Sequence, residues 1–233
     1  MRKISIIIPA YMEKKNLPKL AKQLEEALRE DEFEVIIVND GNLDGSIQTI
    51  NEIEKEYIKM RGLFFSKRRG KTKAIKDGFE ESRGEIIVIM DADLQYSPED
   101  IPKLVEALKH ADVTNGLRAK RKDGIIRVLE SKIYNLFVQF FFGMKFRDCN
   151  SGLKVFKRKV MEDIVDQLGD GWHRYLLVLA IKRGYKVTEI PIKHYPRTAG
   201  RPKFPSSPLK LVKGFRDLLS VKAYTLRQKH QRS

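Results

Sequence analysis

The chain has 233 residues, of which 42% are hydrophobic and 33% charged, and this indicates a globular protein with room for one sizeable core. Its formal net charge is +15, and residues 196–233 hold ten Lys or Arg against one acid, Asp217. That excess favours an anionic partner such as a nucleic acid, a phospholipid surface or a phosphorylated substrate. The single cysteine, Cys149, excludes an internal disulfide and fits a reducing compartment.

Strand-like and helix-like segments alternate along the first part of the chain. Short, β-branched apolar runs predict strands at residues 4–8, 35–38, 63–65 and 86–90. Apolar residues at helical spacing predict helices between them, at residues 16–30, 45–57 and 73–82. This alternation is typical of βαβ units, so we expect an α/β fold with a mostly parallel central sheet and helices on both faces.

Beyond about Gly116 the pattern is looser. It predicts a long helix at residues 125–144, a short strand near 153–156 and helices near 161–168 and 174–183. A strand at 186–192 follows, and then a loop rich in Pro and Gly that runs to Pro208. The remaining residues predict a basic amphipathic helix at the C-terminus.

The most informative stretch is residues 86–95, IIVIMDADLQ, a buried strand that ends in Asp91 and Asp93. In an extended chain, side chains at i and i+2 share a face, and open α/β sheets bind ligands at the carboxyl ends of their strands. Two adjacent carboxylates repel each other unless a cation lies between them, and oxygen ligands suit Mg²⁺ or Mn²⁺. An acidic loop or helix cap is the alternative for these residues taken alone.

Two other strand ends carry acids and turn residues. The first predicted strand runs into PAYME, which ends at Glu13, and the second runs into NDGNLDG, residues 39–45. Because the carboxyl ends of parallel strands meet at one edge of a sheet, these segments are expected beside Asp91 and Asp93. Three such ends together indicate a nucleotide-binding crevice.

Four segments together resemble the inverting GT-A glycosyltransferases of family 2: IIIPAYMEKKNL, VIIVNDGNLDGS, RGKTKAIKDGFEESRGEIIVIMDADLQYSPEDI and DCNSGLKVFKR. DADLQ with SGLKVFKR most resembles the dolichyl-phosphate mannose synthase-like branch, whose members transfer a sugar from a nucleotide to a polyprenyl phosphate. The resemblance implies a GT-A catalytic domain at residues 1–205, with a nucleotide-binding half (1–117) and an acceptor-binding half (118–205). Residues 206–233 would form the separate basic amphipathic helix.

On the donor side, the resemblance implies a nucleotide-binding role for residues from several loops. These residues are Pro9, Tyr11, Glu13, Asn39, Asp40, Lys71, Arg197 and Lys203. Arg197 and Lys203 match a late basic loop that closes over the donor diphosphate. Asn39 stands where many family members have Asp and is a frequent variant, whereas Asn42 stands where Ser is usual, which leaves the base specificity open. Beside Gly, Asp40 and Asp44 are also natural turn residues; we assign function to Asp40 and a turn role to Asp44.

The metal and diphosphate ligands implied by the resemblance are Asp91, Asp93 and Gln95, with Mg²⁺ or Mn²⁺ as the cofactor. The implied catalytic residues are Asp91, Asp93, Arg118, Arg127 and Ser131. Asp91 and Asp93 would activate the leaving group through the cation. The other three would hold the acceptor phosphate, since Arg pairs bidentately with phosphate oxygens. Such an acceptor is already ionised near neutral pH, so direct inverting displacement needs no strong base.

The donor is less well defined by the sequence. Mannose from GDP-mannose is the commonest pairing in this branch, with UDP-glucose second. The family often has an acid where Tyr175 or Leu176 stands here, and this departure leaves the exact branch open. Trp172 and His173, just before, are predicted to be packing residues.

Residues 136–144, LFVQFFFGM, are apolar on nearly every face of the predicted helix, which indicates either burial or a place in lipid. We favour the interfacial role, because a polyprenyl tail would leave the acceptor site here. The basic C-terminal helix suits anionic lipid. No apolar run approaches the roughly 20 residues of a membrane span, and no secretory signal follows Met1. We therefore expect a cytoplasmic protein bound peripherally to the cytosolic membrane face, or one that needs a membrane partner subunit.

Three other functions compete with this one. A family 2 enzyme that uses UDP-glucose or UDP-N-acetylglucosamine, or a non-lipid acceptor, differs only in its substrates. A nucleotidyltransferase on a similar fold should carry an early Gly-rich loop, whereas the first loop here, PAYMEKKN, has no glycine. A nucleic-acid binder would suit the basic charge, but the Arg and Lys clusters lack interleaved aromatic residues, so we expect no nucleic-acid partner.

Overall fold

The computed structural model describes residues 3–41, 44–118, 125–144, 146–197 and 208–230. Within these ranges the strands form one seven-stranded sheet in the order β3-β2-β1-β4-β6-β5-β7. The strands are β1 (Ile4–Ala10), β2 (Phe33–Asp40), β3 (Met60–Phe65), β4 (Ile86–Met90), β5 (Val113–Arg118), β6 (Leu153–Lys157) and β7 (Val187–Ile192). Strand β6 runs antiparallel to β4 and β5, and the other pairs are parallel.

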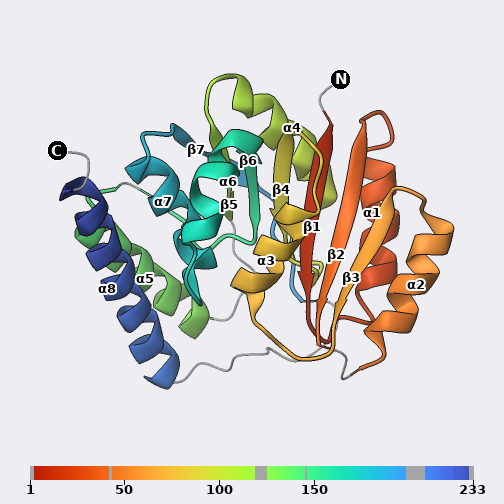
Figure 1. The fold of residues 1–233 in the computed structure, drawn as a ribbon, viewed down its shortest axis with the longest axis horizontal. Helices are drawn as coiled ribbons and strands as arrows, with labels where there is room; N and C mark the ends of the chain where they lie inside the picture. Colours follow the sequence, from red (N-terminus) through yellow and green to blue (C-terminus); the bar gives the residue numbers. More distant parts are fainter. Residues whose placement is uncertain (1–2, 42–43, 119–124, 145, 198–207, 231–233) are drawn as a thin grey trace.

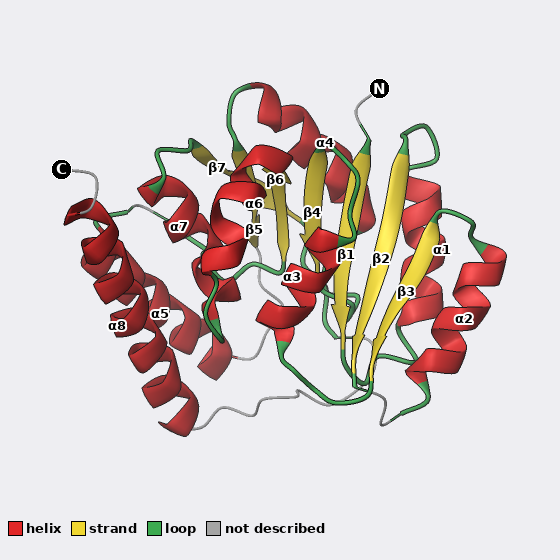
Figure 2. Ribbon diagram, in the orientation of Figure 1, coloured by secondary structure: helices red, strands yellow, loops and turns green. Residues whose placement is uncertain are grey.

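Helices cover both faces of this sheet (Figures 1 and 2). The α-helices are α1 (Leu17–Ala27), α2 (Ser46–Glu56), α3 (Lys71–Glu80), α4 (Ile101–Glu106), α5 (Ile125–Phe142), α6 (Arg158–Ile164), α7 (Leu176–Lys182) and α8 (Pro208–His230). Short 3₁₀ turns are η1 (Pro98–Asp100), η2 (Ala107–Lys109), η3 (Val165–Gln167) and η4 (Trp172–Tyr175). Of these turns, η4 contributes His173 and Arg174 to the lining of the cavity that forms the candidate site.

Alternation along the strands divides the core into two layers. In β1, Ile6 and Ile8 pack with the apolar faces of α1, α2 and α4, whereas Ile7 packs on the opposite side. That second layer receives residues from α3, α5, α6, α7 and α8. Because both faces of the central strands are covered, their sequences are nearly continuous apolar runs.

The predicted fold class is confirmed: a mostly parallel sheet with helices on both faces. Strand β4 matches its predicted range of 86–90, and most other predicted elements are displaced by only a few residues. No range was predicted for α4 or β5, and no sequence pattern indicated that β6 would run antiparallel. None of the helices in the described residues combines the length and apolar character that a membrane span needs.

Helices α5 and α8 pack side by side at one end of the molecule (Figure 1). The ring of Phe215 on α8 lies 6.1 Å from the ring of Phe137 and 6.0 Å from the ring of Phe141, both on α5. The apolar segment in α5 is divided between core and surface: Val138 and Phe142 are buried, whereas Phe140 is 81% exposed. The segment is therefore neither wholly core nor wholly interfacial.

Candidate active site

A cavity of about 420 Å³ lies at the carboxyl ends of β1 and β4 and extends to α5, η4 and α8. It brings together eleven of the residues that the sequence nominated: Pro9, Tyr11, Glu13, Asp40, Lys71, Asp91, Asp93, Gln95, Arg118, Ser131 and Arg197. Asn39 is fully buried and does not line this cavity. The side chain of Arg127 and the whole of Lys203 lie outside the described residues. One cavity thus unites most of the predicted donor and acceptor residues.

Asp91 and Asp93 both line the cavity, but the chain does not stay extended between them. Strand β4 ends at Met90, the next residues form bends, and Leu94 has a left-handed φ of 59°. The backbone N–H of Asp91 donates to the carbonyl of Gly152 over 3.1 Å, which ties this bend to the segment before β6. The predicted pairing of the two carboxylates is present, and a bend rather than an extended strand produces it.

Asp93 is an unusual carboxylate. Its side chain is only 9% exposed, and burial together with the negative charge of Asp91 raises its pKa to about 6, against the opposing influence of Arg197. The guanidinium of Arg197 donates to Asp93 Oδ2 over 2.6 Å, and the backbone N–H of Gln95 donates to Asp93 Oδ1 over 3.2 Å. The negative charge at this position therefore depends on neighbouring cations.

Basic side chains hold both carboxylates. Lys71, the first residue of α3, forms an ion pair with Asp91, and Arg197 pairs with Asp93 and, over 3.5 Å, with Glu13. The Nε of Arg197 is buried and has no hydrogen-bond partner among the described residues. Three carboxylates and two cations thus form ion pairs in the lining of the cavity, and these cations can exchange a carboxylate for a phosphate oxygen.

The donor side is ordered by Asp40 at the end of β2. Its carboxylate accepts hydrogen bonds from the backbone N–H groups of Arg69 and Gly70, over 2.6 and 2.7 Å, so it fixes the loop that leads into Lys71. The guanidinium of Arg68, in the same loop, lies 4.4 Å from the centre of the Tyr11 ring. The turn role of Asp44 is confirmed, because its carboxylate accepts hydrogen bonds from the N–H and hydroxyl of Ser46.

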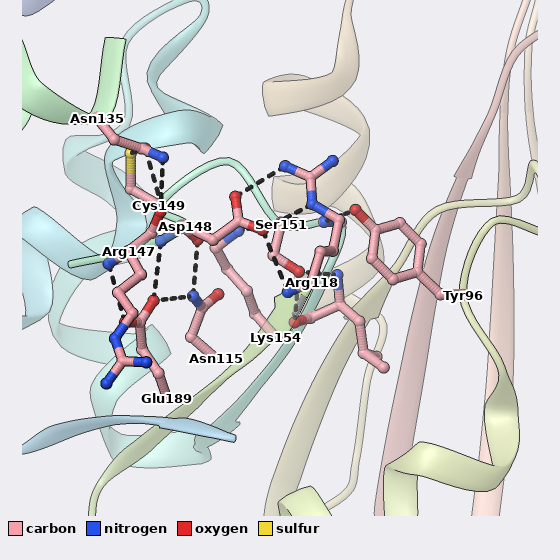
Figure 3. Close-up of polar contacts among 12 residues, drawn as sticks. Tyr96, Asn115, Arg118, Asn135, Arg147, Asp148, Cys149, Ser151, Lys154 and Glu189 are labelled. Atoms are coloured by element: carbon pink, nitrogen blue, oxygen red, sulfur yellow. Dashed lines mark hydrogen bonds and ion pairs between the residues drawn. The ribbon is translucent and has the colours of Figure 1, made fainter. Parts of the chain in front are cut away.

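Arg118 on the acceptor side has a partner that the sequence did not reveal. Its Nε and Nη2 donate to the two oxygens of Asp148 over 2.6 and 2.7 Å, and both side chains are almost fully buried (Figure 3). This is the bidentate geometry that an Arg uses for a phosphate. Here, however, the partner is the carboxylate of Asp148, and this pairing fixes the guanidinium of Arg118 at the cavity wall.

A polar network fixes the segment around Asp148 in turn (Figure 3). Asn115 on β5 donates to the carbonyl of Asp148 over 2.8 Å, and Glu189 on β7 accepts from the N–H groups of Arg147 and Asp148 over 2.9 and 3.0 Å. Asn135 on α5 donates to the carbonyl of Arg147 over 2.7 Å. Contacts to β5, β7 and α5 therefore hold this segment in one conformation.

Lys154 on β6 is a cavity residue that sequence reasoning missed. It is 4% exposed and donates to the carbonyl of Ser151, and burial together with the nearby positive charge of Lys71 lowers its pKa to about 8. The available signal was a lysine inside the buried strand pattern LKVF. A buried lysine at the floor of the cavity adds to its affinity for anions.

Ser131, Tyr134 and Arg174 line the wall formed by α5 and η4. The hydroxyl groups of Ser131 and Tyr134 are buried; that of Ser131 has no hydrogen-bond partner within the described residues, and that of Tyr134 adjoins the hydroxyl of Tyr175. Trp172 is buried as predicted, but His173 lines the cavity instead of packing in the core, and its Nδ1 lies 2.9 Å from the hydroxyl of Thr72. Sequence reasoning nominated only Ser131 of these, since no motif marks the other positions.

Comparisons with known proteins agree with this geometry. A family model described as "Glycosyl transferase family 2" matches residues 5–165. An undecaprenyl-phosphate 4-deoxy-4-formamido-L-arabinose transferase from Pseudomonas fluorescens (strain Pf0-1) is 31% identical over 229 residues. The match covers 95% of this chain but only 65% of that relative, so this chain spans about two thirds of the relative's length.

Solved structures show the same fold. Glucosyl-3-phosphoglycerate synthase from Mycobacterium tuberculosis, in complex with phosphoglyceric acid, superposes with a TM-score of 0.70 at 17% identity, covering 96% of this chain and 80% of that one. The mannosyltransferase PcManGT from Pyrobaculum calidifontis, in complex with GDP-Man and Mn²⁺, gives 0.57 at 18% identity, covering 84% and 58%. These similarities confirm the GT-A fold. By its family match and its relatives, the chain belongs to glycosyl transferase family 2.

Proposed function

We propose that this protein transfers a hexose from a nucleotide-sugar donor to a polyprenyl phosphate, with inversion at the anomeric carbon. The observation that carries the proposal is the shared cavity, in which Asp91 and Asp93 with their paired cations face a wall with a buried, unpartnered Ser131 hydroxyl. One side suits a diphosphate with its cation, and the other suits a second anion. The relative's name, which includes undecaprenyl phosphate, supports a polyprenyl phosphate as that second anion.

The chemistry of the carboxylates fits a divalent cation. Asp91 and Asp93 supply hard oxygen ligands, Lys71 and Arg197 form ion pairs with them, and Gln95 lies beside them. In the described residues no group of three or more His, Cys, Asp or Glu is arranged to hold a metal, so this pair would leave positions for diphosphate oxygens. When bound, Mg²⁺ or Mn²⁺ would neutralise the charge that develops on the leaving diphosphate.

Protein side chains do the remaining work on the donor side. Lys71 and Arg197 would move from the carboxylates to the diphosphate oxygens, which keeps every charge in the site paired. Tyr11 and Asp40 would flank the base and ribose, with Pro9, Glu13 and Asn39 shaping the same region. Lys203 is proposed to join Arg197 over the diphosphate. In this proposal, residues 1–117 bind the nucleotide, and Arg197 crosses over from the acceptor half.

On the acceptor side, the phosphate is its own nucleophile. Because it is ionised near neutral pH, the protein must place one oxygen behind the anomeric carbon, and no general base need remove a proton. Ser131 would donate its hydroxyl to that phosphate, and Arg127 is proposed to lie beside it. Arg118, paired with Asp148, would contribute positive charge from a fixed position at the wall of the cavity.

The polyprenyl chain would leave along α5 and α8. Their exposed apolar side chains include Leu129, Ile133, Leu136, Phe137, Phe140, Phe215, Leu219 and Leu226. Apolar side chains beside a basic C-terminal segment suit the surface of an anionic membrane. We therefore propose peripheral action at the cytosolic membrane face, with a membrane partner subunit as the alternative arrangement.

The test is a two-phase transfer assay. Purified protein, Mg²⁺ or Mn²⁺ and undecaprenyl or dolichyl phosphate are mixed in turn with labelled GDP-mannose, UDP-glucose or UDP-N-acetylglucosamine. We expect label to enter the organic phase, with GDP-mannose as the preferred donor. Transfer from a UDP-sugar alone would correct the donor. If folded protein with detergent and metal transferred no label from any of the three, transfer of these sugars to a polyprenyl phosphate by this chain alone would be refuted.

A further inference from the structure

The wall of the cavity on the side of α5 contains an arginine, Arg174, that has no part in the proposed function. Arg174 lies on η4, lines the cavity and is half-buried. Among the described residues it has no hydrogen bond and no ion pair, whereas Lys71, Arg118 and Arg197 in the same cavity are each paired with a carboxylate. A half-buried guanidinium without a counter-ion is costly unless an anion completes it.

The surroundings of Arg174 show where that anion would lie. A side chain at Gly214 of α8 would meet the Tyr134 ring at 3.7 Å and Arg174 Nη1 at 3.8 Å, so these three residues adjoin one another. The hydroxyl of Tyr175 donates to the carbonyl of Gly214 over 3.1 Å, which fixes α8 against η4. The guanidinium is therefore held between η4, α5 and α8.

Two buried hydroxyl groups belong to the same wall. Ser131 and Tyr134 lie one helical turn apart on α5, so their side chains share a face. Ser131 is only 9% exposed, and its hydroxyl has no hydrogen-bond partner among the described residues, whereas the hydroxyl of Tyr134 adjoins that of Tyr175. Buried hydroxyl groups are almost always satisfied in native proteins, so the hydroxyl of Ser131, in the same cavity as the unpaired Arg174, indicates a place for a ligand.

Arg174 and its neighbour His173 contact different parts of the cavity lining. His173 reaches the hydroxyl of Thr72 on α3, next to Lys71 and hence to the carboxylates. Arg174 instead adjoins Tyr134 of α5 and Gly214 of α8. Adjacent residues of η4 thus face the two halves of the site, and Arg174 belongs to the half that faces α5 and α8.

We propose that Arg174, with the hydroxyl groups of Ser131 and Tyr134, forms the subsite that binds the phosphate of the acceptor. A guanidinium can donate two parallel hydrogen bonds to a phosphate, and the hydroxyl groups supply further donors. The proposal rests on the proposed function for the identity of the ligand, a lipid phosphate monoester. It also accounts for acceptor binding although Asp148 engages Arg118.

The test measures phosphate binding directly, apart from catalysis. Phosphorus-31 NMR follows the titration of geranyl phosphate, and separately of inorganic phosphate, with the wild type, Arg174→Gln, Arg174→Lys and Arg83→Gln. Arg83 is exposed at the turn before β4, away from the cavity, so its variant is the charge-matched control. We expect Arg174→Gln to weaken geranyl phosphate binding at least tenfold, Arg174→Lys to weaken it by less, and Arg83→Gln to leave it unchanged.

Binding of GDP or UDP with Mn²⁺ to each variant shows whether the fold and the donor side are intact. If Arg174→Gln does not fold, Arg174→Lys decides, because it keeps the charge and loses only the paired donors. If either folded variant, Arg174→Gln or Arg174→Lys, binds geranyl phosphate as tightly as the wild type does, the proposed subsite is refuted. Equal binding of inorganic and geranyl phosphate overturns its assignment to a lipid acceptor.

The transfer assay separates the two proposals. Sugar transfer by the wild type, combined with unaltered geranyl phosphate binding by Arg174→Gln, would refute the subsite and leave the proposed function standing. No transfer by the wild type, combined with weakened binding by the variant, would refute the function and leave a phosphate subsite.

Discussion

The two sides of the cavity differ in how their charges are balanced. On the donor side, the carboxylates of Asp91 and Asp93 are paired with Lys71 and Arg197. On the acceptor side, Ser131 and Arg174 have no partner among the described residues. On the donor side, Lys71 and Arg197 can exchange their carboxylates for phosphate oxygens when a ligand brings its own cation. On the acceptor side, an anion alone supplies the missing partner of Ser131 and Arg174. The same cavity can therefore bind two anions without bringing them to the same place.

The largest expected effect is on stability, and it concerns the buried ion pair between Arg118 and Asp148 in the cavity wall. Asp148→Asn would leave Arg118 buried without its counter-ion, and removing one partner of a buried pair typically costs about 3–5 kcal/mol. Urea unfolding should show a loss of this order. The matched control is Glu26→Gln, which removes a carboxylate from an exposed ion pair with Lys22 and should cost well under about 1 kcal/mol. Equal losses in the two variants would show that the buried pair does not hold the wall.

The next largest effect concerns catalysis on the donor side. Asp93→Asn removes a proposed cation ligand, and sugar transfer should fall by about 10²- to 10³-fold, the usual cost of losing a group that stabilises transition-state charge. Binding of geranyl phosphate should not change. The exposed Glu99, in η1 next to the same strand end, supplies the control Glu99→Gln. Near-normal turnover of Asp93→Asn at limiting Mn²⁺ would refute the role of Asp93.

These two residues also show what could be predicted from the sequence. Asp93 was found because DADLQ follows an apolar run whose range matches β4, so the signal is local. Asp148 was missed as a partner of Arg118 because the two residues lie 30 positions apart, and only the antiparallel insertion of β6 next to β5 brings them together. Arg174 carried no signal either, since an arginine at the start of a predicted helix looks like an ordinary surface residue. Local motifs thus predicted the donor side, whereas long-range packing creates much of the acceptor wall.

The pH dependence of cation binding offers a further test. Because burial and Asp91 raise the pKa of Asp93 to about 6, Asp93 takes up a proton, and loses its charge, as the pH falls through that value. Mn²⁺ affinity should therefore weaken by about tenfold between pH 7 and pH 5, and Asp93→Asn should abolish most of this dependence. Titration of Mn²⁺ at several pH values measures it. A flat profile down to pH 5 in the wild type would contradict the assignment.

A smaller effect is expected at Lys71. Lys71→Gln removes one of two cations from the diphosphate, so the KM for the nucleotide-sugar should rise by about tenfold, the worth of one charge-assisted hydrogen bond. The KM for the polyprenyl phosphate should stay within a factor of two, and Lys73→Gln, two residues further along α3, is the control. A rise in the KM for the lipid alone would place Lys71 on the acceptor side.

The central claim is that one cavity holds two separate anion sites, and calorimetric titration of two ligands into three proteins tests it most directly. GDP or UDP with Mn²⁺, and geranyl phosphate, would each be titrated into the wild type, Asp93→Asn and Ser131→Ala. We predict that Asp93→Asn weakens only nucleotide binding and that Ser131→Ala weakens only geranyl phosphate binding. If both variants weakened the binding of the same ligand and left the other unchanged, the division of the cavity would be refuted.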